Sequence, residues 1–147
     1  MTKLLVLNGP NLNLLGRREP ELYGHRSYTE LCDLIRAHAA ESGIDVEIIQ
    51  TNHEGVLVDR IQEAQGVYDG IVLNPAAYTH TSVALLDALL AVGIPAVEVH
   101  LTDPAAREPF RAVSYVRAAC AATIVGRGFD GYLEAMDLLQ AMAKKRA

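Results

Sequence analysis

The sequence predicts an α/β protein: a doubly wound parallel sheet of five strands with helices on both faces. Short apolar runs of strand length alternate with longer segments of helical periodicity along the 147 residues. Strands separated by helices form parallel sheets that helices cover on both faces. The second apolar run alternates with acidic residues, which suits a strand at one edge. Five strands favour the flavodoxin-like order 2-1-3-4-5, which places the second strand at that edge.

The strands are expected where short apolar runs end in turns or polar residues. The first run ends in the sequence Asn8-Gly9-Pro10, which indicates a sharp turn. A continuous apolar run later in the chain is typical of a strand buried on both faces. The expected strands are residues 3–8, 44–50, 70–74, 94–100 and 122–125.

The helices are expected from their periodicity and their capping residues. Ser27 and Glu30 form a capping box at the start of the first helix. Gly43, Gly66 and Gly93 are expected to end the first three helices. The expected helices are residues 28–42, 56–65, 82–92 and 132–144.

Composition and charge exclude several classes of protein. The net charge is −5, aromatic residues make up 5% of the chain and tryptophan is absent, so the features of a nucleic-acid binder are missing. No apolar run approaches the ~20 residues that span a bilayer, and the short apolar start lacks a signal-peptide core, so a cytoplasmic protein is expected. Cys32 and Cys120 have no C-x-x-C spacing and are expected to be reduced. No repeat or linker divides the chain, so a single domain (residues 1–147) is expected.

Polar side chains gather where the expected strands end. In a doubly wound sheet, ligands bind beyond the carboxyl ends of the strands, and three of those ends are Asn8, Asn74 and His100. The connections over residues 9–26 and 101–115 exceed the ~2–6 residues that such a turn needs, which indicates loops that build a site. The polar residues of the loops at this edge are Asn11, Arg17, Arg18, Tyr23, Tyr78, His80, Thr102, Arg107 and Arg111.

Several familiar chemistries lack their sequence signals. There is no G-x-S-x-G elbow and no H-E-x-x-H pair. Lysine occurs only at positions 3, 144 and 145, so a Schiff base has no candidate residue. The sequence GRGFDG (residues 126–131) has the letters of a dinucleotide-binding loop, but no strand follows its helix, so it predicts a tight turn. No cofactor and no metal are expected.

Three ordered blocks of sequence resemble one family. The blocks are NGPNLNLLGRREP (residues 8–20) followed by Tyr23-Gly24, NPAAYTHTS (residues 74–82) and EVHL (residues 98–101). The pattern continues in Arg107-Glu108, Phe110-Arg111 and Gly131-Tyr132. These blocks extend over nearly the whole chain, and the sequence closely resembles type II 3-dehydroquinate dehydratase.

The resemblance implies a lyase that dehydrates 3-dehydroquinate to 3-dehydroshikimate through an enolate, without a metal or a Schiff base. It implies the flavodoxin-like fold and a homo-oligomer, a dodecamer built as four trimers. The same dehydration serves the shikimate pathway, which leads to chorismate and the aromatic amino acids, and quinate catabolism; both roles stay open. No nucleic acid or membrane is implied as a partner.

The resemblance also implies a role for each catalytic residue. Tyr23 would remove the proton alpha to the ketone, with Arg18 favouring its phenolate. Asn11 would hold the water that stabilises the enolate oxygen, and His100 would protonate the leaving hydroxyl. Glu98, on the same face of the same strand, would hold the imidazole of His100. From the residues alone, Tyr23 could equally be an ordinary loop tyrosine, Asn11 a turn former and Glu98 a buried structural acceptor.

Further positions are implied to bind the hydroxyls and the carboxylate of the substrate. Asp87 matches a family position near a subunit contact, and Arg111 suits an anionic substrate, although either could be a solvated surface residue. Most relatives have Ser-Asn after His-Leu, whereas this chain has Thr102-Asp103, which keeps the hydroxyl and adds a negative charge. The implied substrate-binding residues are Asn74, His80, Asp87, Leu101, Thr102 and Arg111.

Two other classes of function stay open from the residues alone. A flavodoxin-like module that binds small polyols or anions without turnover would not need Tyr23, Arg18 and His100 together. A metal-assisted hydrolase would use His80 and His100, and chelation would abolish its activity.

Overall fold

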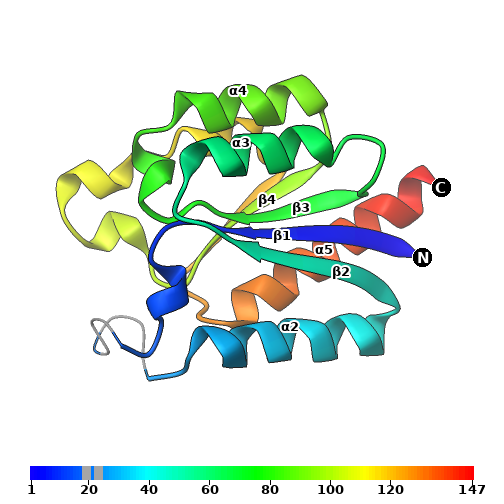
Figure 1. Ribbon diagram of the computed structural model, residues 1–147, viewed down its shortest axis with the longest axis horizontal. Coiled ribbons are helices and arrows are strands. Elements are labelled where there is room, and N and C mark those ends of the chain that lie inside the picture. Colours follow the sequence, from blue (N-terminus) through cyan, green and yellow to red (C-terminus); the bar gives the residue numbers. More distant parts are fainter. Residues whose placement is uncertain (18–20, 22–24) are drawn as a thin grey trace.

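Parallel pairing of five short strands builds the sheet in the predicted order. The computed structural model describes residues 1–17, 21 and 25–147. The strand order is β2-β1-β3-β4-β5, and every pair is parallel (Figure 1). The strands are β1 (Thr2–Asn8), β2 (Ile44–Gln50), β3 (Gly70–Asn74), β4 (Ala96–His100) and β5 (Ala122–Val125). The predicted fold class is confirmed.

Helices cover both faces of this sheet, and each face buries its own apolar cluster. The helices α2 (Tyr28–Ser42) and α5 (Asp130–Arg146) lie on one face, and α3 (Glu54–Glu63) and α4 (Val83–Val92) lie on the other (Figure 1). Alternate residues of a strand point to opposite faces. Accordingly, Leu4 and Val6 of β1 join the cluster under α2 and α5, whereas Leu5 and Leu7 join the cluster under α3 and α4.

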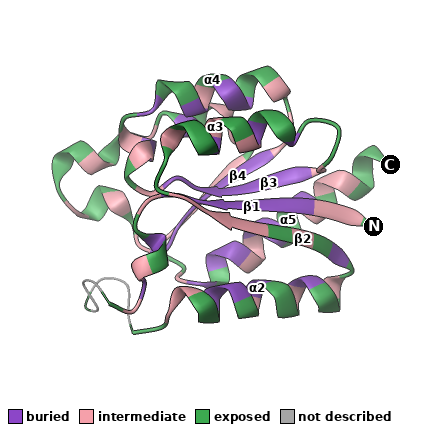
Figure 2. Cartoon of the chain, viewed as in Figure 1, coloured by how far each residue is buried: buried purple, intermediate pink, exposed green. Residues whose placement is uncertain are grey.

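Burial follows the position of each strand in the sheet. Every residue of β3 and β4 is buried, including the polar residues Glu98 and His100 (Figure 2). The edge strand β2 exposes Asp45 and Glu47, as its alternating sequence predicts. In the described part of the chain, no helix combines the length and apolarity needed to cross a bilayer.

The predicted caps Ser27, Gly43 and Gly93 are in place, whereas α3 has Ala64 rather than Gly66 as its C-cap. A few boundaries also differ from the prediction. The Ser27 hydroxyl accepts a hydrogen bond from the Glu30 N–H at 3.1 Å, and Gly43 ends α2 in the left-handed conformation. β4 begins at Ala96 rather than at residue 94, since Pro95 has no N–H to donate to a strand ladder. Helix α3 begins and ends two residues earlier than predicted, with His53 at its N-cap. Helix α5 extends two residues beyond the prediction at both ends.

The turn after β1 is locked against the turn after β3. The Gly9 N–H donates to the Asn74 carbonyl at 2.8 Å, and a Cβ atom on Gly9 would lie 2.5 Å from the carbonyl oxygen of Pro75. Only glycine therefore allows the two backbones to approach this closely.

We predict that Gly9→Ala destabilises the protein by about 1–3 kcal/mol, because neither backbone can move without breaking its hydrogen bonds. The free energy of unfolding in urea measures this. Gly55→Ala in α3 is the matched control: nothing lies within 4 Å of its added Cβ atom, so this helical substitution is expected to be neutral or stabilising. Equal stability of the two variants would contradict the prediction.

Candidate active site

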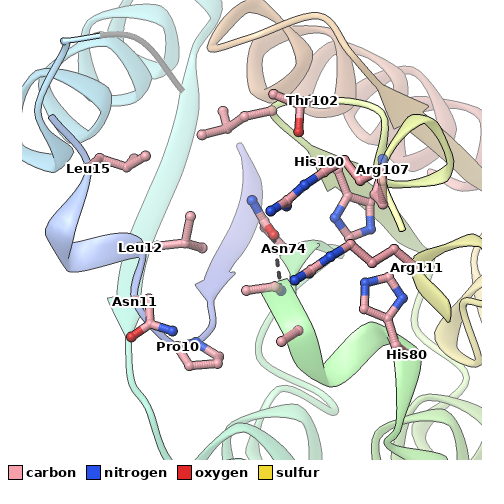
Figure 3. A pocket seen from close by; sticks show the side chains of 14 residues that line it. Pro10, Asn11, Leu12, Leu15, Asn74, His80, His100, Thr102, Arg107 and Arg111 are labelled. Atoms are coloured by element: carbon pink, nitrogen blue, oxygen red, sulfur yellow. Dashed lines mark hydrogen bonds between the residues drawn. The ribbon is translucent and has the colours of Figure 1, made fainter. Parts of the chain in front are cut away.

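A cavity of about 210 Å³ lies beyond the carboxyl ends of β1, β3 and β4, at the edge of the sheet that the sequence predicts (Figure 3). It is walled by the turn after β1, the 3-10 turn η2 (Ala76–His80) and the loop that follows β4. Its lining residues are Pro10, Asn11, Leu12, Leu15, Asn74, Ala76, Ala77, His80, His100, Leu101, Thr102, Pro104, Arg107 and Arg111.

Among the described residues, the structure brings the predicted site residues together except for Asp87. The predicted residues that line the cavity are Asn11, Asn74, His80, His100, Leu101, Thr102 and Arg111. Glu98 is fully buried behind His100, whereas Asp87 is exposed on α4 and does not line the cavity. Arg18 and Tyr23 fall outside the described residues.

Glu98 and His100 form a buried pair at the end of β4. The two residues point to the same face of the strand, and His100 Nε2 lies 2.5 Å from Glu98 Oε2. The imidazole is 7% exposed, so one edge of the ring meets the cavity while the other meets the carboxylate. With Nε2 engaged by Glu98, Nδ1 is the ring nitrogen left for a ligand.

The Glu98 carboxylate is held by side chains from separate segments of the chain. On Oε2 it accepts hydrogen bonds from the hydroxyls of Thr79 at 3.0 Å and Ser114 at 2.7 Å. On Oε1 it accepts from Arg117 Nε at 3.1 Å and from the Thr123 hydroxyl at 3.2 Å. All of its acceptor capacity is therefore used inside the protein.

These contacts keep Glu98 ionised despite its burial. Burial alone would raise the pKa of the carboxyl, but hydrogen bonds from His100, Arg117 and Ser114 outweigh it and hold the pKa of Glu98 well below its usual range. A fixed negative charge thus lies directly behind the imidazole. It favours a ring that is protonated on Nε2, which orients the free nitrogen toward the cavity.

His80 and Arg111 line the same side of the cavity, from η2 and from the loop after β4 (Figure 3). His80 Nδ1 lies 2.7 Å from the carbonyl oxygen of Val113, and because a carbonyl only accepts, Nδ1 carries the proton. Arg111 forms an ion pair with Glu108, and its guanidinium lies 5.1 Å from the centre of the Phe110 ring. Both side chains are anchored on one side and offer polar atoms to a ligand on the other.

Thr102 and Asp103 are adjacent in sequence, but their side chains make different contacts. Thr102 lines the cavity, whereas Asp103 does not. The Asp103 carboxylate accepts from the N–H of Ala105 at 3.0 Å and caps the 3-10 turn η3 (Pro104–Ala106). Its negative charge is therefore occupied at the start of this turn.

Asn11 lies on a strained turn that the end of β2 supports. Its φ angle is 70°, a left-handed conformation that asparagine tolerates better than most residues. Its N–H donates to Asn52 Oδ1 at 3.1 Å, and Gln50 Nε2 donates to the Gly9 carbonyl at 3.1 Å. The turn that carries Asn11 is thus fixed by two side chains that the sequence analysis did not single out.

Sequence reasoning assigned no role to several residues of the site. Arg107 lines the cavity; the sequence analysis noted it among the polar loop residues and in a motif but gave it no role. Arg117, Ser114 and Thr123 reach Glu98 from later segments. Thr123 lies opposite Glu98 in the pairing of β4 with β5. This register could have identified Thr123, but it is known only from the assembled sheet. Among the described residues, no group of three or more potential metal ligands is gathered.

Comparisons with known proteins agree with one another. The model of the family described as "Dehydroquinase class II" matches residues 2–140. The "3-dehydroquinate dehydratase 1" of Corynebacterium efficiens is 52% identical over 137 residues, which are 93% of this chain and 91% of that protein. The "Catabolic 3-dehydroquinase" of Aspergillus clavatus is 51% identical over 144 residues, which are 98% of this chain and 96% of that protein.

A solved structure extends the agreement to three dimensions. The crystal structure of type II dehydroquinase from Butyrivibrio crossotus superposes with a TM-score of 0.93 at 47% sequence identity. The match covers 95% of this chain and 97% of that structure. The similarity therefore extends over nearly the whole fold.

We predict that Glu98→Gln lowers stability at neutral pH by roughly 3–5 kcal/mol, because it removes the buried partner of His100 and Arg117. The pKa of Glu98 is lower in the folded chain than in the unfolded chain, so its contribution is complete above the unfolded value near 4.5 and is lost as the pH falls below it. Below about pH 4.5 the wild-type protein should therefore lose stability more steeply than the variant.

Urea unfolding between pH 3 and 7 measures both effects. Glu134→Gln is the control, since its ion pair with Arg127 is exposed to solvent and is expected to contribute little to stability. Parallel pH profiles for the wild type and Glu98→Gln would contradict the assigned charge.

Proposed function

The chain belongs to the class II dehydroquinase family, and on that premise we propose which of its residues carry out the reaction. It is a 3-dehydroquinate dehydratase, a lyase that removes water from 3-dehydroquinate to give 3-dehydroshikimate. The observation that carries this conclusion is the family match over residues 2–140. Its relatives are named both as 3-dehydroquinate dehydratases and as catabolic 3-dehydroquinases, so biosynthetic and catabolic roles occur among them.

Tyr23 is the proposed base of the reaction. Loss of water from a β-hydroxy ketone begins with removal of a proton alpha to the carbonyl, which leaves an enolate. A phenol with a pKa near 10 is mostly protonated at neutral pH, so it needs a cation nearby. Arg18 is the proposed cation, because arginine stays charged throughout the working range and a charge within ~4–6 Å lowers the pKa of an acid by ~1–3 units. Both assignments come from the NGPNLNLLGRREP motif and the tyrosine after it.

Asn11 is proposed to hold the water that stabilises the enolate oxygen. Its position on the cavity wall and the fixed turn beneath it support this role. A preorganised hydrogen-bond donor is most effective where negative charge develops in the transition state.

His100 is proposed to protonate the departing hydroxyl. As the enolate reforms the carbonyl, its electrons form the new carbon–carbon double bond and the carbon–oxygen bond breaks. The hydroxyl takes a proton from the His100 ring and leaves as water. The buried Glu98 carboxylate supports this role, because its contact with Nε2 orients the ring and leaves Nδ1 for the substrate.

The remaining cavity residues are proposed to bind the substrate. The carboxylate of 3-dehydroquinate requires cations or hydrogen-bond donors, and the Leu101-Thr102 segment with Arg111 offers these in the cavity wall. Asn74 and His80 offer polar atoms to the hydroxyl groups.

We propose that the active assembly is a dodecamer of four trimers in which Asp87 acts in the site of a neighbouring copy. Its exposure on α4, outside the cavity of its own chain, supports a contribution across a subunit contact. Exposed apolar side chains in the loop after β4, Phe110, Val113 and Tyr115, offer a surface for such a contact.

A cytoplasmic location is part of the proposal and agrees with the free thiols of Cys32 and Cys120.

We expect Tyr23→Phe and His100→Ala each to slow turnover by roughly 10²–10⁴-fold, because each removes one proton-transfer group. Ultraviolet absorbance of the conjugated enone product measures the rate with 3-dehydroquinate. Arg18→Ala should raise the pKa of the catalytic base that the pH–rate profile reports, toward the value of an ordinary tyrosine. Near-native turnover by Tyr23→Phe would mean that another base operates.

We predict that Asp87→Ala loses most activity, whereas a mixed oligomer assembled from Asp87→Ala and His100→Ala chains regains part of it. Some interfaces in the mixture combine an intact Asp87 with an intact His100. Light scattering on the purified protein should give twelve chains per particle. A mixed oligomer as inactive as the two single variants would show that Asp87 does not act in the site of a neighbouring copy.

A further inference from the structure

A directed chain of hydrogen bonds runs beneath the cavity from η2 to the C-terminal helix. The N–H of Ala76 donates to Asn74 Oδ1 at 3.1 Å, and Asn74 Nδ2 donates to the Tyr132 hydroxyl at 2.9 Å. Tyr132 in turn donates to Asn8 Oδ1 at 2.7 Å. Asn74 lines the cavity, whereas Tyr132 is fully buried on α5 behind it and is not itself a lining residue.

The direction of this chain is fixed by groups that cannot reverse. The backbone N–H of Ala76 can only donate, so the oxygen of the Asn74 amide must face it. Burial raises the pKa of Tyr132 above its usual range, so its hydroxyl keeps one proton, which it donates to Asn8. The Tyr132 oxygen therefore accepts from Asn74, and the nitrogen of the Asn74 amide must face α5.

We propose that Tyr132 is a positioning residue for the dehydration: it fixes the Asn74 amide so that its second Nδ2 hydrogen is presented to the cavity. One hydrogen bond at the oxygen end would leave the amide plane free to swing about the Ala76 contact. A second bond at the nitrogen end removes that freedom. The cavity consequently offers a donor at Asn74, which selects a substrate oxygen that accepts, such as a hydroxyl or carboxylate oxygen.

The backbone beside the cavity reinforces this orientation. Ala76 has a φ of 53°, a left-handed conformation that is unfavourable for alanine. Its N–H finds its partner in the side chain of Asn74. If the Asn74 amide were flipped, its NH2 group would face the N–H of Ala76, and the strained turn would lose this hydrogen bond.

Steady-state kinetics with 3-dehydroquinate test this inference, which rests on the proposed function. Tyr132→Phe keeps the ring and removes the hydroxyl, so we expect KM to rise roughly three- to tenfold with kcat changed by less than about twofold. Tyr28→Phe is the matched control, since the Tyr28 hydroxyl accepts from Asn8 Nδ2 at 3.2 Å at the far end of the same network. It should leave KM within about twofold of the wild type, and both variants are assayed below their unfolding transitions.

A double substitution separates positioning from a general structural role. If Tyr132 acts through Asn74, Tyr132→Phe adds no further rise in KM to Asn74→Leu; independent, multiplying effects would overturn the proposal. An unchanged KM in Tyr132→Phe, or an equal rise in Tyr28→Phe, would also overturn it.

Asn74→Asp tests the donor at the position where it meets the cavity. The ionised aspartate keeps the shape of the side chain but supplies only acceptors. We expect it to raise KM at least as much as Asn74→Leu, and a wild-type KM would contradict a donor at this position. All of these outcomes are ratios to the wild type, whereas failure of the wild type to turn over 3-dehydroquinate would instead refute the function itself.

Discussion

The buried charge of Glu98 is the constraint on which the rest of the site depends. A carboxylate without solvent is costly unless every oxygen lone pair is satisfied. Here the partners come from η2, from residues 114–117, from β5 and from His100 on its own strand. Satisfying this one charge therefore assembles the back wall of the cavity and sets the orientation of the imidazole. The network that stabilises the fold is also the network that orients the proposed proton donor.

The sheet provides the second requirement, which is the convergence of strand ends. β1, β3 and β4 are parallel neighbours, so the residues that end them lie at one edge although they are far apart in sequence. Asn8 and Asn74 pair across β1 and β3, and both contact Tyr132 of α5. Close packing of the turns at Gly9 and Pro75 keeps this edge compact. Backbone pairing between the strands, rather than the loops, therefore holds this edge of the cavity in place.

Much of this architecture could be predicted from local sequence. Apolar runs, the Ser27 capping box and the acidic alternation of β2 are each specified by neighbouring residues, and the fold class with its strand order follows from them. The sheet edge of the site and most of its lining residues were also predictable, because strand ends and long loops mark them. The contacts of Arg117 and Thr123 with Glu98, and of Tyr132 with Asn74, were not, because they depend on strand register and on packing between distant segments. Arg18 and Tyr23 lie outside the described residues and remain predictions from the motif.

The central claim is that Glu98 contributes to turnover through His100. A double-mutant cycle in kcat tests it most directly, with Glu98→Gln, His100→Ala and the double variant assayed on 3-dehydroquinate under conditions where each is folded. If Glu98 acts by orienting the imidazole, its substitution slows the wild-type enzyme but has no further effect once His100 is absent. Independent effects that multiply in the double variant would contradict the account.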